Sequence, residues 1–443
     1  MPDILSVAKK QVEYGVALGA DQVEVYVVNQ SQARLNISNA HIVGGDVLDV
    51  GGAGVRVYKN KALGLASTTR LEDLKEAVEK AYKMAKGTTK DPLFKTLPEA
   101  MQYTPVDGLY DEKLAEVSFE DLSMRLMEGV KIASGDNDYV VSAGLTRSIN
   151  EIGIANSLGV ECSYIGTNIS GSISSKLERG EDVAVGRGIT MGRSLSKFDP
   201  VKAGSEAISK ATARIGASKV DSGTMDLIID YRGTRSSIGS VLGVGVNGLN
   251  VALGTSFLSD NIGDMIATES LTVIDNPHVV GGLGSRSFDV EGCPSTQLEI
   301  VEKGVLKTFV TDSYSSGCLG IANTGNASKR SLTSKPSPSL TNLIVTPGSW
   351  SFEELIKETK QGILMEDSGL GARGNSTNIS SMVNSGYYVE NGEIIHPVKN
   401  TMIGTTVFNF LKNIGGLTKD VLTEGGSSTP ALKLKNVKVS GGR

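Results

Sequence analysis

The spacing of hydrophobic residues in the first 86 positions alternates between that of helices and that of strands. Apolar side chains recur every three or four positions over residues 4–19, which predicts an amphipathic helix ending near Gly19. Residues 71–86 return to the same helical spacing. Between them, hydrophobic and polar residues alternate as in strands at residues 21–29, 33–37, 54–57 and 62–66. Glycine pairs at Gly44-Gly45 and Gly51-Gly52 predict turns between these strands. The pattern predicts a helix, a several-stranded sheet and a second helix.

The next part of the chain repeats neither pattern for long. Residues 87–118 are rich in Thr, Pro and Asp, which predicts a surface connection. Helices are predicted at 119–133 and 200–217. Strands are predicted at 139–148, 152–155 and 159–174, with a hairpin turn at 156–159 (NSLG) and an interdomain hinge at 219–223.

The second half of the chain has few helical patterns. It opens with a buried strand at 224–230 and closes with a clearly alternating strand at 431–439. Short strands and glycine turns fill most of the interval, and residues 352–361 give the clearest helix. We therefore predict an α+β protein with an α/β N-terminal domain at 1–218, its connection near 87–118, and a β-rich C-terminal domain at 219–443.

Composition narrows the class of protein. The chain has 443 residues, of which 53 are glycine, and its aromatic content is 5%, which favours many turns and hairpins. A net charge of −5 argues against nucleic acid as a partner. Asp3 and Lys9-Lys10 lead us to expect no signal peptide at the N-terminus, and three widely spaced cysteines predict no disulfide framework. The expected location is the cytoplasm.

Residues 236–259 contain no charge, and three interpretations compete for this segment. Its length suits a membrane span, but five glycines and two asparagines oppose that interpretation, so we expect no membrane partner. Gly243, Gly245 and Gly248 form G-x-G-x-x-G, yet the preceding strand ends about a dozen residues too early for a dinucleotide-binding loop. The third interpretation is a helix that has lost the ligands of a metal site.

That third interpretation comes from a resemblance. Residues 254–263 (GTSFLSDNIG) resemble the block that follows the metal-binding helix H-E-x-x-x-H in the TldD branch of the TldD/PmbA family. Aligned without gaps, Gly239 stands at the first His, Ser240 at the Glu and Val244 at the second His. Further blocks agree at residues 281–292, 301–307, 324–327, 342–348, 387–398 and 437–442.

The substitutions matter chemically. In H-E-x-x-x-H, side chains about one turn apart on a helix hold Zn²⁺, and the Glu activates its water. Glycine and valine cannot ligate a metal, serine is a poor general base, and no cysteine follows Cys318, where active relatives carry a third ligand. The resemblance therefore implies the TldE (PmbA) branch, which lacks the zinc-binding motif, with no catalytic and no metal-binding residue in this chain.

Other residues offer weaker candidates for chemistry. His41, His278 and His396 lie far apart in sequence, and a non-local metal site that adds Cys293 and Cys318 remains an alternative. Isolated cysteines are more often buried structural residues, and His278 and His396 are interpreted as surface or turn residues. No G-x-S-x-G is present to suggest a serine nucleophile. We interpret Asp289, Glu291 and Glu302 as hairpin surface charges and Lys329-Arg330 as an exposed turn, with carboxylate binding by this pair as the minority interpretation.

The resemblance implies a function in proteolysis. It predicts a non-catalytic subunit in a heterodimer with a TldD-like metallopeptidase, which carries the zinc and cleaves unfolded or extended peptides; older naming links the family to DNA gyrase. Gly281, Gly282 and Gly284 are the candidate peptide-cleft backbone, on a glycine-rich strand to which a peptide adds. The alternatives are a stand-alone homodimeric peptidase with non-local ligands, a nucleotide-binding or regulatory protein, and a homodimer of the isolated chain.

Overall fold

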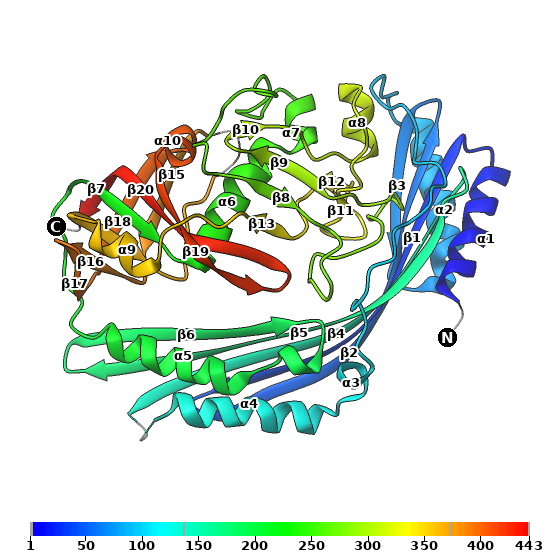
Figure 1. Ribbon diagram of the computed structural model, residues 1–443. Coiled ribbons are helices and arrows are strands. Elements are labelled where there is room, and N and C mark those ends of the chain that lie inside the picture. The colour runs from blue at the N-terminus through cyan, green and yellow to red at the C-terminus, as the bar shows by residue number, and fades with distance from the viewer. Residues whose placement is uncertain (1–2, 136–137, 373, 375, 442–443) are drawn as a thin grey trace.

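The computed structural model describes residues 3–135, 138–372, 374 and 376–441, and it is built on two large sheets. A six-stranded sheet uses the chain up to Gly192, and a twelve-stranded sheet uses the chain from Gly223 onward. In Figure 1 the six-stranded sheet forms a long curved layer, and the twelve-stranded sheet lies on its concave side. The predicted α+β class is confirmed, whereas the division into domains 1–218 and 219–443 stays a prediction.

The six-stranded sheet is made of two similar halves. Its order is β3-β2-β1-β4-β5-β6, every neighbouring pair is antiparallel, and each half contributes a helix, three strands and another helix. The central strands β1 and β4 join the halves along their length, from Glu24 opposite Asn156 to Ser38 opposite Ser142. The bounds are α1 (Ile4–Ala17), β1 (Gln22–Ser38), β2 (His41–Lys59), β3 (Ala62–Thr68), α2 (Leu74–Gly87), α3 (Glu112–Glu116), α4 (Phe119–Ala133), β4 (Tyr139–Asn156), β5 (Glu161–Arg179), β6 (Asp182–Gly192) and α5 (Pro200–Ala213).

In the first half of the six-stranded sheet, the prediction of turns at the glycine pairs is wrong. Gly44-Gly45 and Gly51-Gly52 lie inside β2, and the chain turns at Asn39 and Ala40, whose φ angles of 50° and 57° are left-handed. The glycines serve close packing instead, because a Cβ on Gly45 would lie 2.5 Å from Phe119 Cζ. The hairpin turn predicted at 156–159 is confirmed, since β4 ends at Asn156 and β5 begins at Glu161. Strand β6 was not predicted.

Helices cover the outer face of the six-stranded sheet (Figure 1). Each half brings one helix very close to its edge strand over glycines. A Cβ on Gly64 of β3 would lie 1.8 Å from the carbonyl oxygen of Ala81 in α2, and a Cβ on Gly188 of β6 would lie 1.9 Å from that of Ala203 in α5. Only glycine permits these contacts, so the helices pack backbone to backbone on the sheet.

Strand β20 organises the twelve-stranded sheet. It pairs with β7, β18 and β19 in antiparallel fashion and with β13 in parallel. Helix α6 packs against β20, and this packing encloses the largest hydrophobic core of the molecule. The strands are β7 (Gly223–Ile229), β8 (Val273–Asp275), β9 (Leu298–Glu302), β10 (Val305–Leu306), β13 (Leu343–Val345), β14 (Gln361–Met365), β15 (Asn378–Val383), β16 (Gly386–Glu390), β17 (Glu393–Pro397), β18 (Thr401–Thr406), β19 (Ile414–Glu424) and β20 (Ser427–Gly441). The helices are α6 (Tyr231–Gly245), α7 (Gly248–Ala252), α8 (Ser313–Leu319), α9 (Phe352–Lys357) and α10 (Val407–Lys412).

The uncharged segment 236–259 does not form one helix. Its first part belongs to α6, which ends at Gly245. Val246 and Asn247 are not helical, and α7 follows. Across residues 3–135, 138–372, 374 and 376–441, no helix is long and apolar enough to cross a membrane. Gly243 and Gly245 lie in the last turn of α6 rather than between a strand and a helix, which is not the position that a dinucleotide-binding loop requires.

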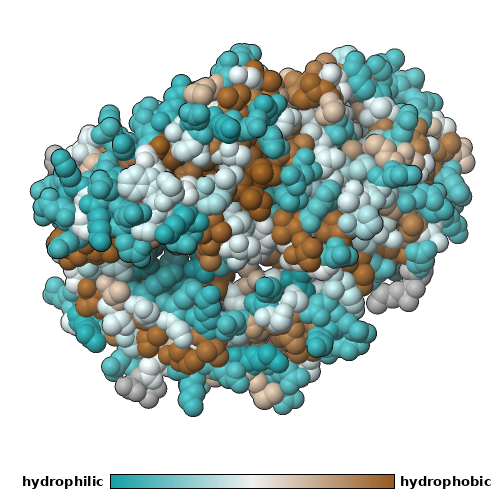
Figure 2. Space-filling model, in the orientation of Figure 1, coloured by the Kyte–Doolittle hydropathy of each residue, from teal (hydrophilic) through white to brown (hydrophobic). Residues whose placement is uncertain are grey.

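A crevice separates parts of the two sheets. It has a volume of about 350 Å³, and β6 and α5 line one side while the turn between β19 and β20 lines the other. Figure 2 shows the hollow between the lower layer and the body above it. Elsewhere the layers touch through apolar side chains, as where Tyr26 and Ile154 of the first sheet pack near Phe288.

Candidate functional site

Helix α6 follows β7 directly and starts at a well-formed cap. The Asp230 carboxylate accepts a hydrogen bond from Gly233 N at 2.7 Å, which satisfies one of the free amides at the helix start. One face of the helix is anchored in the core by Ile238, Val241 and Leu242, all fully buried. Because this face is fixed, the rotation of α6 is fixed, and the adjoining face, with Arg235, Gly239 and Gly243, lines a cavity.

The three positions that the resemblance assigns to the lost metal site do not share one face of α6. Gly239 lines the cavity. The hydroxyl of Ser240 is turned to another segment, where it accepts a hydrogen bond from Ala372 N at 3.0 Å. Val244 is half-buried and does not line the cavity, whereas Gly243, four residues after Gly239, does. On this regular helix the pair that faces the cavity is therefore Gly239 and Gly243.

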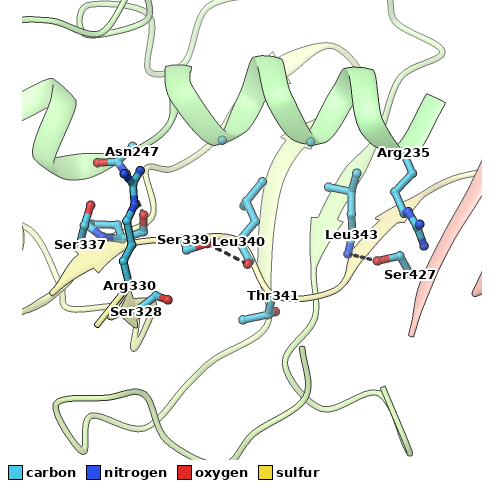
Figure 3. A pocket seen from close by; sticks show the side chains of 13 residues that line it. Arg235, Asn247, Ser328, Arg330, Ser337, Ser339, Leu340, Thr341, Leu343 and Ser427 are labelled. Atoms are coloured by element: carbon cyan, nitrogen blue, oxygen red, sulfur yellow. Dashed lines mark hydrogen bonds between the residues drawn. The ribbon is translucent and has the colours of Figure 1, made fainter. Parts of the chain in front are cut away.

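The cavity beneath α6 has a volume of about 550 Å³. In Figure 3 the helix runs above it and the segment 337–343 runs below, with Arg330 beside Asn247 at one end and Arg235 at the other. The space is open on the helix side, because a Cβ on Gly243 would meet no atom within 4 Å. The lining consists of Arg235, Gly239, Gly243, Asn247, Ser328, Arg330, Ser337, Pro338, Ser339, Leu340, Thr341, Leu343 and Ser427.

The residues present do not fit a zinc ion. Zn²⁺ needs three or four converging Cys, His, Asp or Glu ligands, and the described lining of the cavity has arginines and hydroxyls instead. Two guanidinium groups also make the cavity unfavourable for a dication. Within the described parts of the chain, no group of three or more His, Cys, Asp and Glu residues is placed to hold a metal ion. The absence of catalytic and metal-binding residues remains a prediction.

The other candidate ligands do not line this cavity. His41 is exposed at the start of β2, and His278 lies in a turn with a buried Nε2 that has no partner among the described residues. His396 lies in β17, where its ring is 2.9 Å from the Pro397 carbonyl oxygen and stacks on Tyr388. Burial raises the pKa of the Cys293 thiol far above its usual value, which keeps the thiol protonated and disfavours it as a metal ligand.

The candidate cleft glycines lie in a turn, so the prediction that they lie on a strand is wrong. Residues 279–285 form no strand, and Gly281 has a left-handed φ of 65°. Gly281 N donates to the Asp107 carbonyl (3.2 Å) and Gly284 N donates to Asn342 Oδ1 (3.0 Å). The carbonyl of Gly282 accepts from Arg193 Nε at 2.7 Å. These backbone groups are occupied within the chain, although Gly281 does line the crevice; its role in a peptide cleft stays a prediction.

Three charged residues expected on the surface, Asp289, Glu291 and Lys329, are buried. Glu291 is fully buried, and the side chain of Lys329 is 5% exposed, whereas Glu302 and Arg330 are exposed as predicted. Arg56 Nη2 donates to Glu291 Oε1 at 2.7 Å and also pairs with Glu24, to which Lys329 Nζ lies at 3.3 Å. The exposed-turn interpretation therefore holds for Arg330 but is wrong for Lys329.

This network, which we call the junction cluster (Glu24, Arg56, Asp289, Glu291, Asp312 and Lys329), joins the two sheets. Glu24 and Arg56 belong to β1 and β2, and the other members lie in the C-terminal half of the chain. Burial would raise the pKa of Glu24, but Arg56 and Lys329 lower it below its usual value. The cluster has four carboxyl groups but only two cations. The charged forms of Asp289 and Asp312 are therefore less favourable than that of Glu24.

Asp312 is the member of the cluster that begins a helix. It caps α8 by accepting a hydrogen bond from Ser315 N at 2.8 Å. Burial, followed by the nearby Glu291 carboxylate, raises the pKa of Asp312 to about 6 from an ordinary value of 3.8. The folded state therefore binds this proton more tightly than the unfolded state does. Its contribution to stability is present below about pH 4 and is lost as the pH rises through about 6.

We expect Asp312→Asn to flatten this pH dependence. Asparagine keeps the cap, since its Oδ1 accepts the same hydrogen bond, but it does not titrate. Relative to the wild type, the free energy of unfolding should increase from pH 4 to pH 7.5, by about 1.4 kcal/mol for each unit of pKa shift. Urea unfolding at a series of pH values measures it. Asp199→Asn, at the exposed cap of α5, is the control for cap substitution, and a parallel pH profile for Asp312→Asn and wild type would refute the expectation.

Together, the curved six-stranded sheet of two similar halves, the sheet centred on β20 and the helix above the cavity define an α+β protein of a recognisable class. Residues 23–85 match PmbA/TldA metallopeptidase domain 1, and residues 112–215 match the central domain of the same family. Residues 222–441 match its C-terminal domain. The chain therefore belongs to the PmbA/TldD metallopeptidase family, and the resemblance noted in the sequence is confirmed at the level of the family.

Individual relatives are similar along nearly their whole length. The metalloprotease PmbA homolog of Haemophilus influenzae is 25% identical, covering 97% of this chain and 94% of that protein. The metalloprotease TldD homolog of Buchnera aphidicola is 24% identical, covering 98% and 93%. The crystal structure of TldE from Thermococcus kodakarensis has a TM-score of 0.86 at 24% identity, covering 97% and 99%, which shows a shared fold.

Proposed function

We propose that this chain is the non-catalytic, TldE-like subunit of a heteromeric zinc metallopeptidase. The zinc ion and the catalytic Glu belong to a TldD-like partner, and the substrates are unfolded or extended peptides. The observation that carries this proposal is the face of α6 that opens to the cavity. It presents Gly239, the position that the resemblance gives to the first His, and Gly243, with Arg235 and Arg330 at the ends of the space, and none of these groups is a zinc ligand or a general base.

The same observation weighs against the alternatives. A stand-alone peptidase would need a second constellation of ligands, and the described histidines and cysteines are dispersed among turns, strands and buried positions. A nucleotide-binding protein would need its glycine loop after a strand, whereas Gly243 and Gly245 end a helix. Neither alternative is favoured by a specific feature of the structure.

The test is to purify this chain and the TldD-like chain of the same organism, separately and together. We expect the mixture to hydrolyse a fluorescently labelled unfolded protein such as casein, and this chain alone to show no hydrolysis. A chelator should abolish the activity, as should Glu→Gln in the H-E-x-x-x-H motif of the partner. Stoichiometric zinc in this chain, or hydrolysis by this chain alone, would overturn the proposal.

A further inference from the structure

The lining of the cavity beneath α6 is cationic. Arg235 and Arg330 approach it from opposite ends, and the part of the lining that the structure describes includes no carboxylate (Figure 3). Arg235 is partly neutralised, because its guanidinium donates to the Glu424 carbonyl at 3.1 Å and lies 3.5 Å from the Glu424 carboxylate. The guanidinium of Arg330 has no hydrogen-bond or ion-pair partner among the described residues, and only its backbone amide donates, to Ser334 Oγ at 3.1 Å. The potential in the cavity therefore favours a negatively charged group.

Hydrogen-bond donors gather at the Arg330 end. Strands β11 (Ala327–Ser328) and β12 (Ser337–Pro338) are antiparallel, with Ser328 directly opposite Ser337. Both serines line the cavity, and neither hydroxyl has a partner among the described side chains and backbone groups. Successive residues of an extended chain point to opposite sides, so Ser328 and Arg330 face the cavity while Lys329 faces the junction cluster.

The size of the cavity indicates what kind of anion fits. Its volume of about 550 Å³ falls in the range of small-molecule sites and far exceeds the needs of a lone ion. Gly239 and Gly243 leave the helix side open, since a Cβ at Gly239 would meet only Leu343 Cδ2, at 3.9 Å. The charged group would thus be attached to a larger body that occupies the space along α6.

We propose that this cavity binds an oxyanion at the end formed by Arg330, Ser328 and Ser337. For the source of the anion the inference rests on the proposed function: in a peptidase complex it is the C-terminal carboxylate of a peptide. A guanidinium fork and two hydroxyls match the geometry of a carboxylate. Free phosphate offers the same chemistry, so the experiment must distinguish the two sources.

The test uses this chain alone and three probes in isothermal titration calorimetry. The probes are N-acetyl-trialanine with a free carboxylate, its C-terminal amide, and inorganic phosphate. We expect the free acid to bind, the amide to bind about tenfold more weakly or not at all, and binding to weaken as salt increases. Arg330→Gln should weaken binding of the free acid by about tenfold or more. Its side chain has no partner to lose, so folding should be unaffected.

Two further variants distinguish binding in the cavity from a general effect of the charge of the protein. Gly243→Glu places a carboxylate in the cavity, at a position where a Cβ meets no atom within 4 Å, and should abolish binding. Lys335→Gln removes the same charge from an exposed residue that does not line the cavity, and it should bind like the wild type. Thermal unfolding of each variant verifies that it is folded.

The outcomes are distinct. Binding of phosphate that is lost in Arg330→Gln and Gly243→Glu, without binding of the free acid, would support the oxyanion site and assign it to a free anion. Binding of none of the probes, or binding unchanged in both variants, would overturn the inference. Because no partner subunit is present in this experiment, its result is independent of whether a TldD-like chain confers peptidase activity.

Discussion

Replacing Arg56 by methionine should lower the free energy of unfolding by about 3–5 kcal/mol. The guanidinium of Arg56 lies between Glu24 of the neighbouring strand and Glu291 of the C-terminal half, with Nε 2.9 Å from Glu24 Oε1 and Nη2 2.7 Å from Glu291 Oε1. Both carboxylates are essentially inaccessible to solvent. Methionine fills a similar volume but leaves the two negative charges without their main counter-ion. Equilibrium denaturation in urea at pH 7.5 measures the loss.

A matched arginine tests whether burial is the cause. Arg70 pairs with Glu72 and Asp73, but its side chain is 67% exposed, so Arg70→Met should cost less than about 1 kcal/mol. Adding Glu24→Gln to Arg56→Met should recover part of the stability, because it removes one of the uncompensated charges. Equal losses for Arg56→Met and Arg70→Met would contradict a strongly coupled junction cluster.

Much of the helical structure could be predicted from the sequence. Helices at 4–19, 71–86 and 119–133 correspond to α1, α2 and α4, because each buries one stripe of apolar side chains on the sheet. The strands were predicted too short and too few. Their glycines suggested turns, but Gly45 and Gly52 stand inside a long strand, where the side chain of a distant residue occupies the place of a Cβ. A local pattern cannot reveal a contact made by a distant segment.

The buried charges show the same limit more strongly. Asp289, Glu291 and Lys329 lie in a region of glycine turns, where a charged residue is normally solvated. Glu291 pairs with Arg56 and Lys329 pairs with Glu24, and both partners lie more than 200 positions earlier in the chain. No spacing within either segment signals the other. Only the fold, which brings β1 and β2 against the C-terminal half, creates the pairing.

The candidate site was predictable in part. The alignment of residues 254–263 with the family pointed to this helix and to Gly239, and Gly239 does line the cavity. Ser240 and Val244 do not, because a regular helix rotates them away. The opposite wall, at residues 328–343, lies about a hundred positions further on, so its hydroxyls and Arg330 could not be assigned to the same space from the sequence.

Replacing Arg193 by methionine should release the segment 279–285 and lower the free energy of unfolding by about 3 kcal/mol. Arg193 follows β6 and is 6% exposed, and it holds this segment through carbonyl groups alone. Nε donates to Gly282 O at 2.7 Å, while Nη2 donates to Leu283 O at 3.0 Å and to Ser285 O at 3.1 Å. Methionine has no donor, so these carbonyls would lose their partners. Urea unfolding measures the loss, and hydrogen exchange locates it.

The local character of the effect distinguishes this arginine from one that merely adds charge. Exchange should accelerate at the amides of 279–285, of which Val279, Val280 and Gly281 line the crevice, more than in the core of either sheet. Arg193→Lys should fall between methionine and wild type, because one ammonium cannot reproduce the planar fork that reaches three carbonyls. Arg187→Met, an exposed position on the same strand, is the matched control and should be nearly neutral. If Arg193→Met destabilised the chain without altering exchange in this segment, Arg193 would not be its anchor.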